Sequence, residues 1–327
     1  MNTSPIGLGT VALAAAALCG AAFSGSAAAQ AYPNKPIRLE IPYPAGSASD
    51  IIMRMLVDKM QPELKQPMII EGRPGGGTAV AVRYTMTQPA DGYTLYNYTT
   101  SSAIKSAIKE PPFDVRKDLT HIVSVITAPP ILAINPEKVP AKNVQELIAY
   151  AKANPGKLNF SNYGYGTLSH LCAVLLTQQA GLNVVHVPFK GPVANVMSVS
   201  IGESQLTFDG KGELGKYPPD KVRMLAVSTA ERSSLSPDLP GMRESGFPDF
   251  DMTAVLSLAG PAGLPANVVR TINAAANVAL KDKSLIEGYL KMGLVATGGT
   301  PEQITAQVNH EVETMRKIIS SANLDIE

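Results

Sequence analysis

Hydrophobic residues recur along most of this chain with two alternating periods, one typical of strands and one typical of helices. The run "IRLEI" at 37–41 places apolar side chains at every second position, and "IIMRMLVDKM" at 51–60 then repeats them at helical spacing. Further strand-like runs follow at 93–99, 184–189, 205–208 and 223–229. Because helices that alternate with strands cover the faces of a sheet, this pattern predicts an α/β fold with mostly parallel sheets flanked by helices.

Two turn-rich stretches stand between a strand pattern and a helix pattern. They read "PYPAGSASD" at 42–50 and "SNYGYGTLSH" at 161–170. Ser47 with Asp50 fits the S/T-x-x-D/E signature of a helix start, and Thr167 precedes a second helix that Gly181 ends. Since a helix start offers unpaired N–H groups and the positive end of a dipole, the two stretches together could hold one anion. The plainer alternative is that they only cap helices, but they contain more glycine, hydroxyl and amide groups than a cap needs.

The length of the chain predicts two domains. At 327 residues it is too long for one ordinary core and suits roughly two units of about 150 residues each. No polar linker divides it, but two strand-like runs, "SVITAPPILAIN" and "DMTAVLSLAG", could each cross between the domains. With both crossings, lobe 1 comprises residues 32–130 and 253–327, and lobe 2 comprises residues 131–252.

The first 31 residues have the composition of a secretory signal peptide. Residues 6–23 are mostly Ala, Leu, Gly and Val without a charge, and "SAAAQA" then offers cleavage after Ala29 or Ala31. A membrane anchor is the alternative, but it needs about 20 strongly apolar residues and this run is rich in alanine. Removal of residues 1–31 leaves Cys172 as a single cysteine, which excludes an intramolecular disulfide. The expected location is the periplasm.

Charge and motifs argue against several classes of function. The 28 basic and 27 acidic residues give a formal net charge of +1, so we expect no nucleic acid among the partners. The run "RPGGGTAV" departs from a dinucleotide fingerprint at Val80, and "GYGTL" has Gly where a serine-hydrolase elbow has its nucleophile. The four histidines are not spaced as metal ligands. We therefore expect no catalytic residue, no cofactor and no metal site.

A set of longer motifs resembles one family of proteins. These motifs, in order, are "YPNKPIRLEIPYPAGSASD", "EGRPGGG", "ADGYTL", "FDVRKDL", "KLNFSNYGYGTLSHL", "VHVPFKG", "FDG", "GPAGLP" and "GGTPEQ". They extend over essentially the whole chain after residue 31 and resemble the Bug family, the substrate-binding proteins of tripartite tricarboxylate transporters. The resemblance implies a two-lobed Venus-flytrap fold with two crossing hinge strands and a small organic acid bound in the cleft.

The resemblance also implies which residues bind the ligand. In this family the first loop and the glycine-rich second loop hold a carboxylate, and they correspond here to Tyr43 through Asp50 and to Ser161 through His170. The expected ligand-binding residues are Tyr43, Pro44, Ala45, Gly46, Ser47, Ser49, Asp50, Asn162, Tyr163, Gly164, Gly166, Thr167, His170 and Asp209, the last from the "FDG" motif.

Departures from the usual family pattern bear on the identity of the ligand. Tyr163 and Tyr165 stand where small polar residues are usual, and alternate residues of an extended turn point to opposite sides, so at least one ring could face the cleft. Such a ring would stack on an aromatic acid, and Lys105 could take a second carboxylate. The sharper hypothesis is an aromatic dicarboxylate such as terephthalate, ahead of a small aliphatic dicarboxylate or citrate. The alternative that both rings cover the surface of the lobe stays open.

The sequence thus predicts a monomeric periplasmic solute-binding protein, not an enzyme. It would capture a small organic carboxylate and deliver it to the membrane permease subunits of a tripartite tricarboxylate transporter. The alternative is an extracytoplasmic carboxylate sensor subunit of a signalling system. Because both would use the closed form as their signal, the sequence does not separate them.

Overall fold

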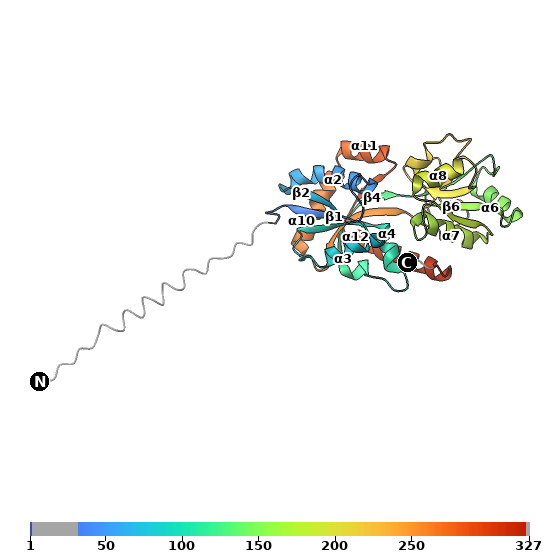
Figure 1. Ribbon diagram of the computed structural model, residues 1–327. Helices are drawn as coiled ribbons and strands as arrows, with labels where there is room; N and C mark the ends of the chain where they lie inside the picture. Colours follow the sequence, from blue (N-terminus) through green and yellow to red (C-terminus); the bar gives the residue numbers. More distant parts are fainter. Residues whose placement is uncertain (2–31, 325–327) are drawn as a thin grey trace.

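The protein is built around two β-sheets that lie in two separate lobes (Figure 1). The computed structural model describes Met1 and residues 32–324, so the predicted signal peptide lies outside the described residues. The sheet of lobe 1 has the order β11-β4-β10-β3-β1-β2, and the sheet of lobe 2 has the order β7-β6-β8-β5-β9. The first sheet contains β1 (Ile37–Ile41), β2 (Met68–Gly72), β3 (Thr94–Thr99), β4 (Leu119–Ala128), β10 (Ala254–Pro261) and β11 (Val295–Gly298). The second contains β5 (Ile131–Ile134), β6 (Asn159–Asn162), β7 (Val185–Pro188), β8 (Leu206–Asp209) and β9 (Arg223–Val227).

Helices cover the faces of both sheets, as the alternating pattern predicted. In lobe 1 they are α2 (Ala48–Leu64), the 3₁₀ turn η1 (Gly76–Thr78), α3 (Ala79–Met86), α4 (Thr100–Ala107), α5 (Val115–Asp118), α10 (Ala266–Ala279), α11 (Lys283–Lys291) and α12 (Pro301–Ser321). In lobe 2 they are α6 (Val144–Ala153), α7 (Leu168–Ala180), α8 (Pro192–Ser200) and α9 (Lys211–Leu214). No helix among residues 32–324 combines the length and the apolar character that a membrane crossing requires.

The chain crosses between the lobes at both segments that the sequence indicated. The first crossing joins β4 to β5 through Pro129 and Pro130, and the second leads from lobe 2 into β10. The backbone of Ser228 bridges the two crossings. Its N donates to Pro130 O of the first crossing at 2.8 Å, and its O accepts from Met252 N of the second at 2.9 Å. The lobe boundaries at 130/131 and 252/253 remain a prediction that this arrangement supports.

The prediction of mostly parallel sheets is wrong in its proportions, because both sheets are mixed. In lobe 1, β1 pairs in parallel with β2 and β3, but β10 runs antiparallel to β3 and β4, and β11 runs antiparallel to β4. In lobe 2, β6 pairs in parallel with β7 and β8, whereas β5 runs antiparallel to β8 and β9. The physical reason is the double crossing: β4 leaves lobe 1 and β10 returns to it, so the two must run in opposite directions side by side.

Apolar packing separates the two faces of the lobe 1 sheet. On one face, side chains of α2, α10 and α11 pack with β1 in a single buried cluster. On the other face, α3, α4 and α12 belong to a cluster that continues into lobe 2 through α7, β6 and β8. Helix α12 contacts α7, and Ser321 Oγ donates to Gln178 Oε1 at 3.2 Å between the lobes. The C-terminal helix therefore links the lobes alongside the two crossing segments.

Candidate functional site

The first loop lies at the carboxyl end of β1, where α2 begins. Ser47 caps α2 as predicted, since its Oγ accepts a hydrogen bond from Asp50 N at 3.2 Å. The Asp50 carboxylate accepts a bond from Gly46 N at 2.8 Å and pairs with Arg54 at 3.0 Å. Burial acts to raise the pKa of Asp50, but the bonds from Arg54 and Gly46 outweigh it and hold that pKa below its usual range. Asp50 is therefore an ionised brace of the loop, and its charge is already paired.

The other members of the first loop divide into an exposed rim and a buried base. Pro44, Ala45 and Gly46 are exposed, and Gly46 has a left-handed φ of 79°. Ser49 is buried, and its Oγ accepts a hydrogen bond from Asn97 Nδ2 of β3 at 2.8 Å. Ser49 thus fixes α2 to the sheet, which leaves the exposed rim and the first amides of α2 to meet a ligand.

Tyr43 connects the first loop to Ser101, which was not among the expected ligand-binding residues. Its hydroxyl donates to Ser101 Oγ at 3.0 Å, at the start of α4. Because β1 and β3 are parallel neighbours, the loop after β1 and the start of α4 after β3 lie at the same edge of the sheet. The hydroxyl-rich run 99–102 and this parallel pairing together could have indicated Ser101.

The second loop lies at the carboxyl end of β6 and is braced by its own polar groups. Asn162 Oδ1 accepts a bond from Gly164 N at 3.0 Å, and Thr167 Oγ1 donates to Gly164 O at 2.6 Å. Thr167 also caps α7 as predicted, by accepting from His170 N at 3.4 Å. His170 Nδ1 accepts a bond from Gly166 N at 3.2 Å. Burial, and to a lesser degree the neighbouring His186, lower the pKa of His170 to about 4, so its ring is neutral at pH 7.

The two tyrosines of the second loop have different surroundings. Tyr165 is 63% exposed and packs edge-on against His170, with 5.0 Å between ring centroids. Tyr163 is half-buried, and its pKa is raised first by burial and next by the nearby Asp209 carboxylate. The Tyr43 hydroxyl of lobe 1 also contributes to that rise. The Tyr163 hydroxyl is therefore near enough to Asp209 and Tyr43 for both to affect its pKa, whereas Tyr165 lies at the surface.

Asp209 ends β8 at the same sheet edge as the second loop, because β6 and β8 are parallel neighbours. It is 3% exposed and accepts hydrogen bonds from Asn195 Nδ2 and from Gly210 N, each at 2.7 Å. Burial raises the pKa of Asp209 to about 7, although these hydrogen bonds lower it. Asn195 lies on α8, fourteen residues before Asp209 along the chain, and no local pattern in the sequence identified it.

Lys105 lies on the same face of α4 as Ser101, one helical turn further along. Its aliphatic chain passes beside the glycine loop after β2, where a Cβ added to Gly77 would lie 3.8 Å from Lys105 Cδ. Lys105 is partly buried, and its ammonium forms no ion pair with any of residues 32–324. The cation thus lies beside the glycine loop after β2, without an ion-pair partner among residues 32–324.

Comparison with known proteins identifies the family. Residues 52–324 match the family model described as "Tripartite tricarboxylate transporter family receptor". A UPF0065 protein of Cupriavidus necator is 30% identical over 314 residues, which cover 96% of this chain and 95% of that protein. BugT of Bordetella pertussis is 27% identical over 303 residues, which cover 91% of this chain and 93% of BugT.

Solved structures share the fold. The periplasmic binding protein BugD is similar with a TM-score of 0.71 and 25% identity, over 90% of this chain and 100% of BugD. A Rhodopseudomonas palustris protein solved with adipate has a TM-score of 0.74 and 24% identity, over 89% of this chain and 98% of that one. MatC of the same organism, solved with malate, has a TM-score of 0.71 and 23% identity, over 88% of this chain and 100% of MatC. Because the family model matches most of this chain, the chain belongs to the family of tripartite tricarboxylate transporter receptors.

Proposed function

We propose that this protein is a periplasmic receptor that captures a small organic carboxylate between its two loops and delivers it to a tripartite tricarboxylate transporter. One observation carries the proposal: a capped helix start, in α2 and in α7, stands at the carboxyl end of a parallel strand in each lobe. Adipate and malate, bound by two proteins of the same fold, are both dicarboxylates and support this class of ligand.

The donors for a carboxylate come from the first turn of each helix. Ser47 accepts from the third amide of α2 and Thr167 from the third amide of α7, so the two amides before each of these have no helical acceptor. One of these four, the amide of Ser169 in α7, already donates to the Tyr163 hydroxyl. Each helix start also presents the positive end of its dipole. Charge-assisted hydrogen bonds contribute about 1.5 to 3 kcal/mol each. Three such bonds and the two helix ends, less the cost of ordering the ligand, approach roughly the 8 kcal/mol of a micromolar site.

The finer proposal concerns the body of the ligand. The Tyr163 hydroxyl is near Asp209 and Tyr43, and a ring that faces the cleft there would offer a flat wall to an aromatic body. Lys105 lies beside the glycine loop after β2, forms no ion pair within residues 32–324, and would pair with a second carboxylate at the far end of that body. An aromatic dicarboxylate such as terephthalate satisfies both features. Tyr165, at the surface, has no part in this proposal.

A competition panel tests the proposal. Terephthalate, benzoate, adipate, malate and citrate are titrated by calorimetry into the wild-type protein, Tyr163→Ala, Lys105→Met and the matched control Tyr165→Ala. We expect Tyr163→Ala to weaken aromatic acids selectively by roughly three- to tenfold. Lys105→Met should weaken dicarboxylates but not benzoate, and Tyr165→Ala should resemble the wild type. Tight binding of aliphatic acids alone would overturn the aromatic part, and no binding of any organic acid would overturn the receptor function.

A further inference from the structure

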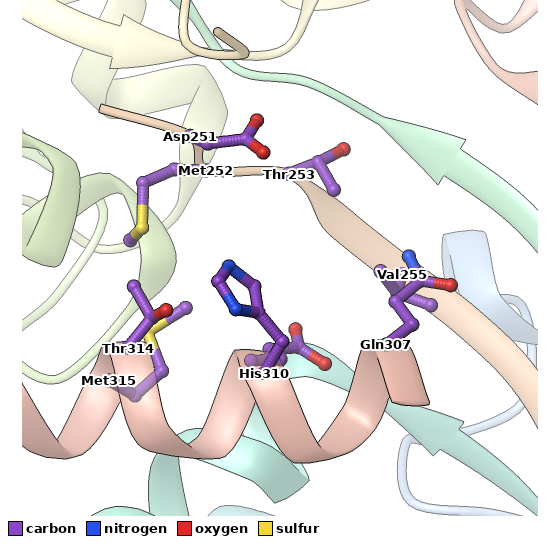
Figure 2. A pocket seen from close by; sticks show the side chains of 9 residues that line it. Asp251, Met252, Thr253, Val255, Gln307, His310, Thr314 and Met315 are labelled. Carbon is purple, nitrogen blue, oxygen red and sulfur yellow. The ribbon is translucent and has the colours of Figure 1, made fainter. Parts of the chain in front are cut away.

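A hollow lies at the hinge, apart from the two loops. It is enclosed by α12 and by residues 251–255, the segment through which the chain returns from lobe 2 into β10. Its volume is about 100 Å³. Figure 2 shows His310 rising from α12 toward the strand segment that carries Asp251 and Thr253. A wider hollow shares Asp251 and His310 with it and continues between α12 and lobe 2.

A buried carboxyl group with one unsatisfied oxygen lines this hollow. Glu311 is 8% exposed, and its Oε2 accepts a hydrogen bond from the Tyr98 hydroxyl at 2.5 Å. Oε1 is buried and has no hydrogen-bond partner among residues 32–324. Burial raises the pKa of Glu311 to about 7, although the nearby hydroxyl groups of Thr100 and Tyr98 lower it. A buried oxygen without a partner destabilises the protein unless a donor enters the hollow, and a cationic donor would also pair the charge.

The rest of the lining suits a donor that carries an alkyl body. Oxygen acceptors are present in the side chains of Asp251, Thr253, Gln307 and Thr314, and apolar walls come from Met252, Val255 and Met315. The basic side chains Arg243 and Lys317 line only the wider hollow beyond it. Within residues 32–324, no three acidic, histidine or cysteine side chains are grouped to hold a metal ion. An organic cation therefore fits this lining better than a metal ion does.

We propose that the hinge hollow is a second binding site, separate from the carboxylate cleft, for a small protonated alkylamine. The ammonium group donates to Glu311 Oε1, and Asp251 adds negative charge at the mouth. The alkyl body packs against the two methionines and Val255.

A titration followed by two-dimensional amide NMR tests this site. Methylammonium chloride and propylammonium chloride are added to the full chain at constant ionic strength, with sodium chloride as reference. We expect saturable shifts confined to residues 251–255 and 307–315, with a dissociation constant of roughly millimolar order for such small ligands. Propylammonium should bind more tightly than methylammonium, because its longer chain buries more apolar surface.

Three variants locate the ammonium group. Glu311→Gln keeps the shape and still accepts from Tyr98, but its neutral amide should weaken alkylammonium binding by about tenfold or more. Asp251→Asn, at the exposed mouth, should weaken it by about threefold and provides a test that does not depend on the buried position. Glu313→Gln, on the exposed face of the same helix, should bind as the wild type does. Equal shifts with sodium chloride, shifts centred elsewhere, or unchanged affinity in both Glu311→Gln and Asp251→Asn would overturn the proposal.

Discussion

The imidazole Nδ1 of His170 lies 3.2 Å from the amide nitrogen of Gly166 and accepts its hydrogen bond. The first turn of α7 thereby holds the loop that precedes it. Only a neutral ring can accept this bond, and burial, with a smaller effect of His186, lowers the pKa of His170 to about 4. The second loop is therefore held in place throughout the pH range near neutrality.

Replacing His170 by Phe should loosen this loop. The variant keeps a ring of similar size but leaves Gly166 N without its acceptor, so the loop must be ordered when the ligand binds. We expect carboxylate affinity to fall by roughly three- to tenfold in calorimetry. His186→Phe is the control, because His186 makes no hydrogen bond to the loop and its ring is 5.7 Å from that of His170. Equal affinities for His170→Phe and wild type would show that the bond does not support the site.

A bulky side chain at either cap residue, Ser47 or Thr167, should reduce both stability and ligand affinity. Ser47→Ile or Thr167→Ile removes a cap and places a branched side chain beside the amides proposed to bind the carboxylate. Each change should cost about 1 kcal/mol of stability and lower affinity by about tenfold or more.

Thr300→Ile is the matched control for the caps. Thr300 caps α12 with a complete capping box, far from either loop in sequence, so its loss should reduce stability to a similar degree without changing affinity. Denaturant titration and calorimetry on all three variants separate the two effects. Unchanged binding in both loop variants would exclude these loops from the site.

Local sequence signals predicted the helix starts, but they could not predict contacts between segments that are distant along the chain. The caps at Ser47 and Thr167 depend on residues three positions apart, and both are confirmed. By contrast, Asn195 bonds Asp209 only because α8 packs beside β8, and Tyr98 bonds Glu311 across 213 residues of chain. Strand direction likewise depends on topology, which is why the alternating pattern predicted mostly parallel sheets and missed the antiparallel return through β10.

Ligand binding should close the lobes. Two crossing segments joined by hydrogen bonds form a hinge, and a carboxylate that bridges α2 and α7 is bound best when the lobes approach each other. Solution scattering should therefore give a smaller radius of gyration at saturating ligand than without ligand. As a control, Lys105→Met should still bind benzoate, so benzoate should reduce the radius of gyration of this variant as well. An identical radius in both states would contradict a flytrap movement.

Glu311 should make the stability of the protein depend on pH in a direction opposite to that of an ordinary paired carboxylate. Its pKa is raised from 4.5 to about 7 in the folded state, chiefly by burial, so between these values the folded state binds a proton that the unfolded state has released. The free energy of unfolding must therefore fall as the pH rises through this window. Asp209 acts in the same direction, whereas the lowered pKa of His170 acts in the opposite one, so the wild-type profile alone does not isolate Glu311.

The difference in the free energy of unfolding between Glu311→Gln and the wild type isolates the contribution of Glu311. Glu311→Gln cannot titrate and still accepts from Tyr98, so its stability relative to the wild type should rise by about 2 to 3 kcal/mol between pH 4.5 and pH 8. Urea denaturation at several pH values measures this difference. Thr305→Ser, on the exposed face of α12, removes no titratable group and should give a curve parallel to that of the wild type. If the Glu311→Gln curve is also parallel to that of the wild type, the pKa of the buried carboxyl group is near its ordinary value, and this group does not lower the stability of the folded state at neutral pH.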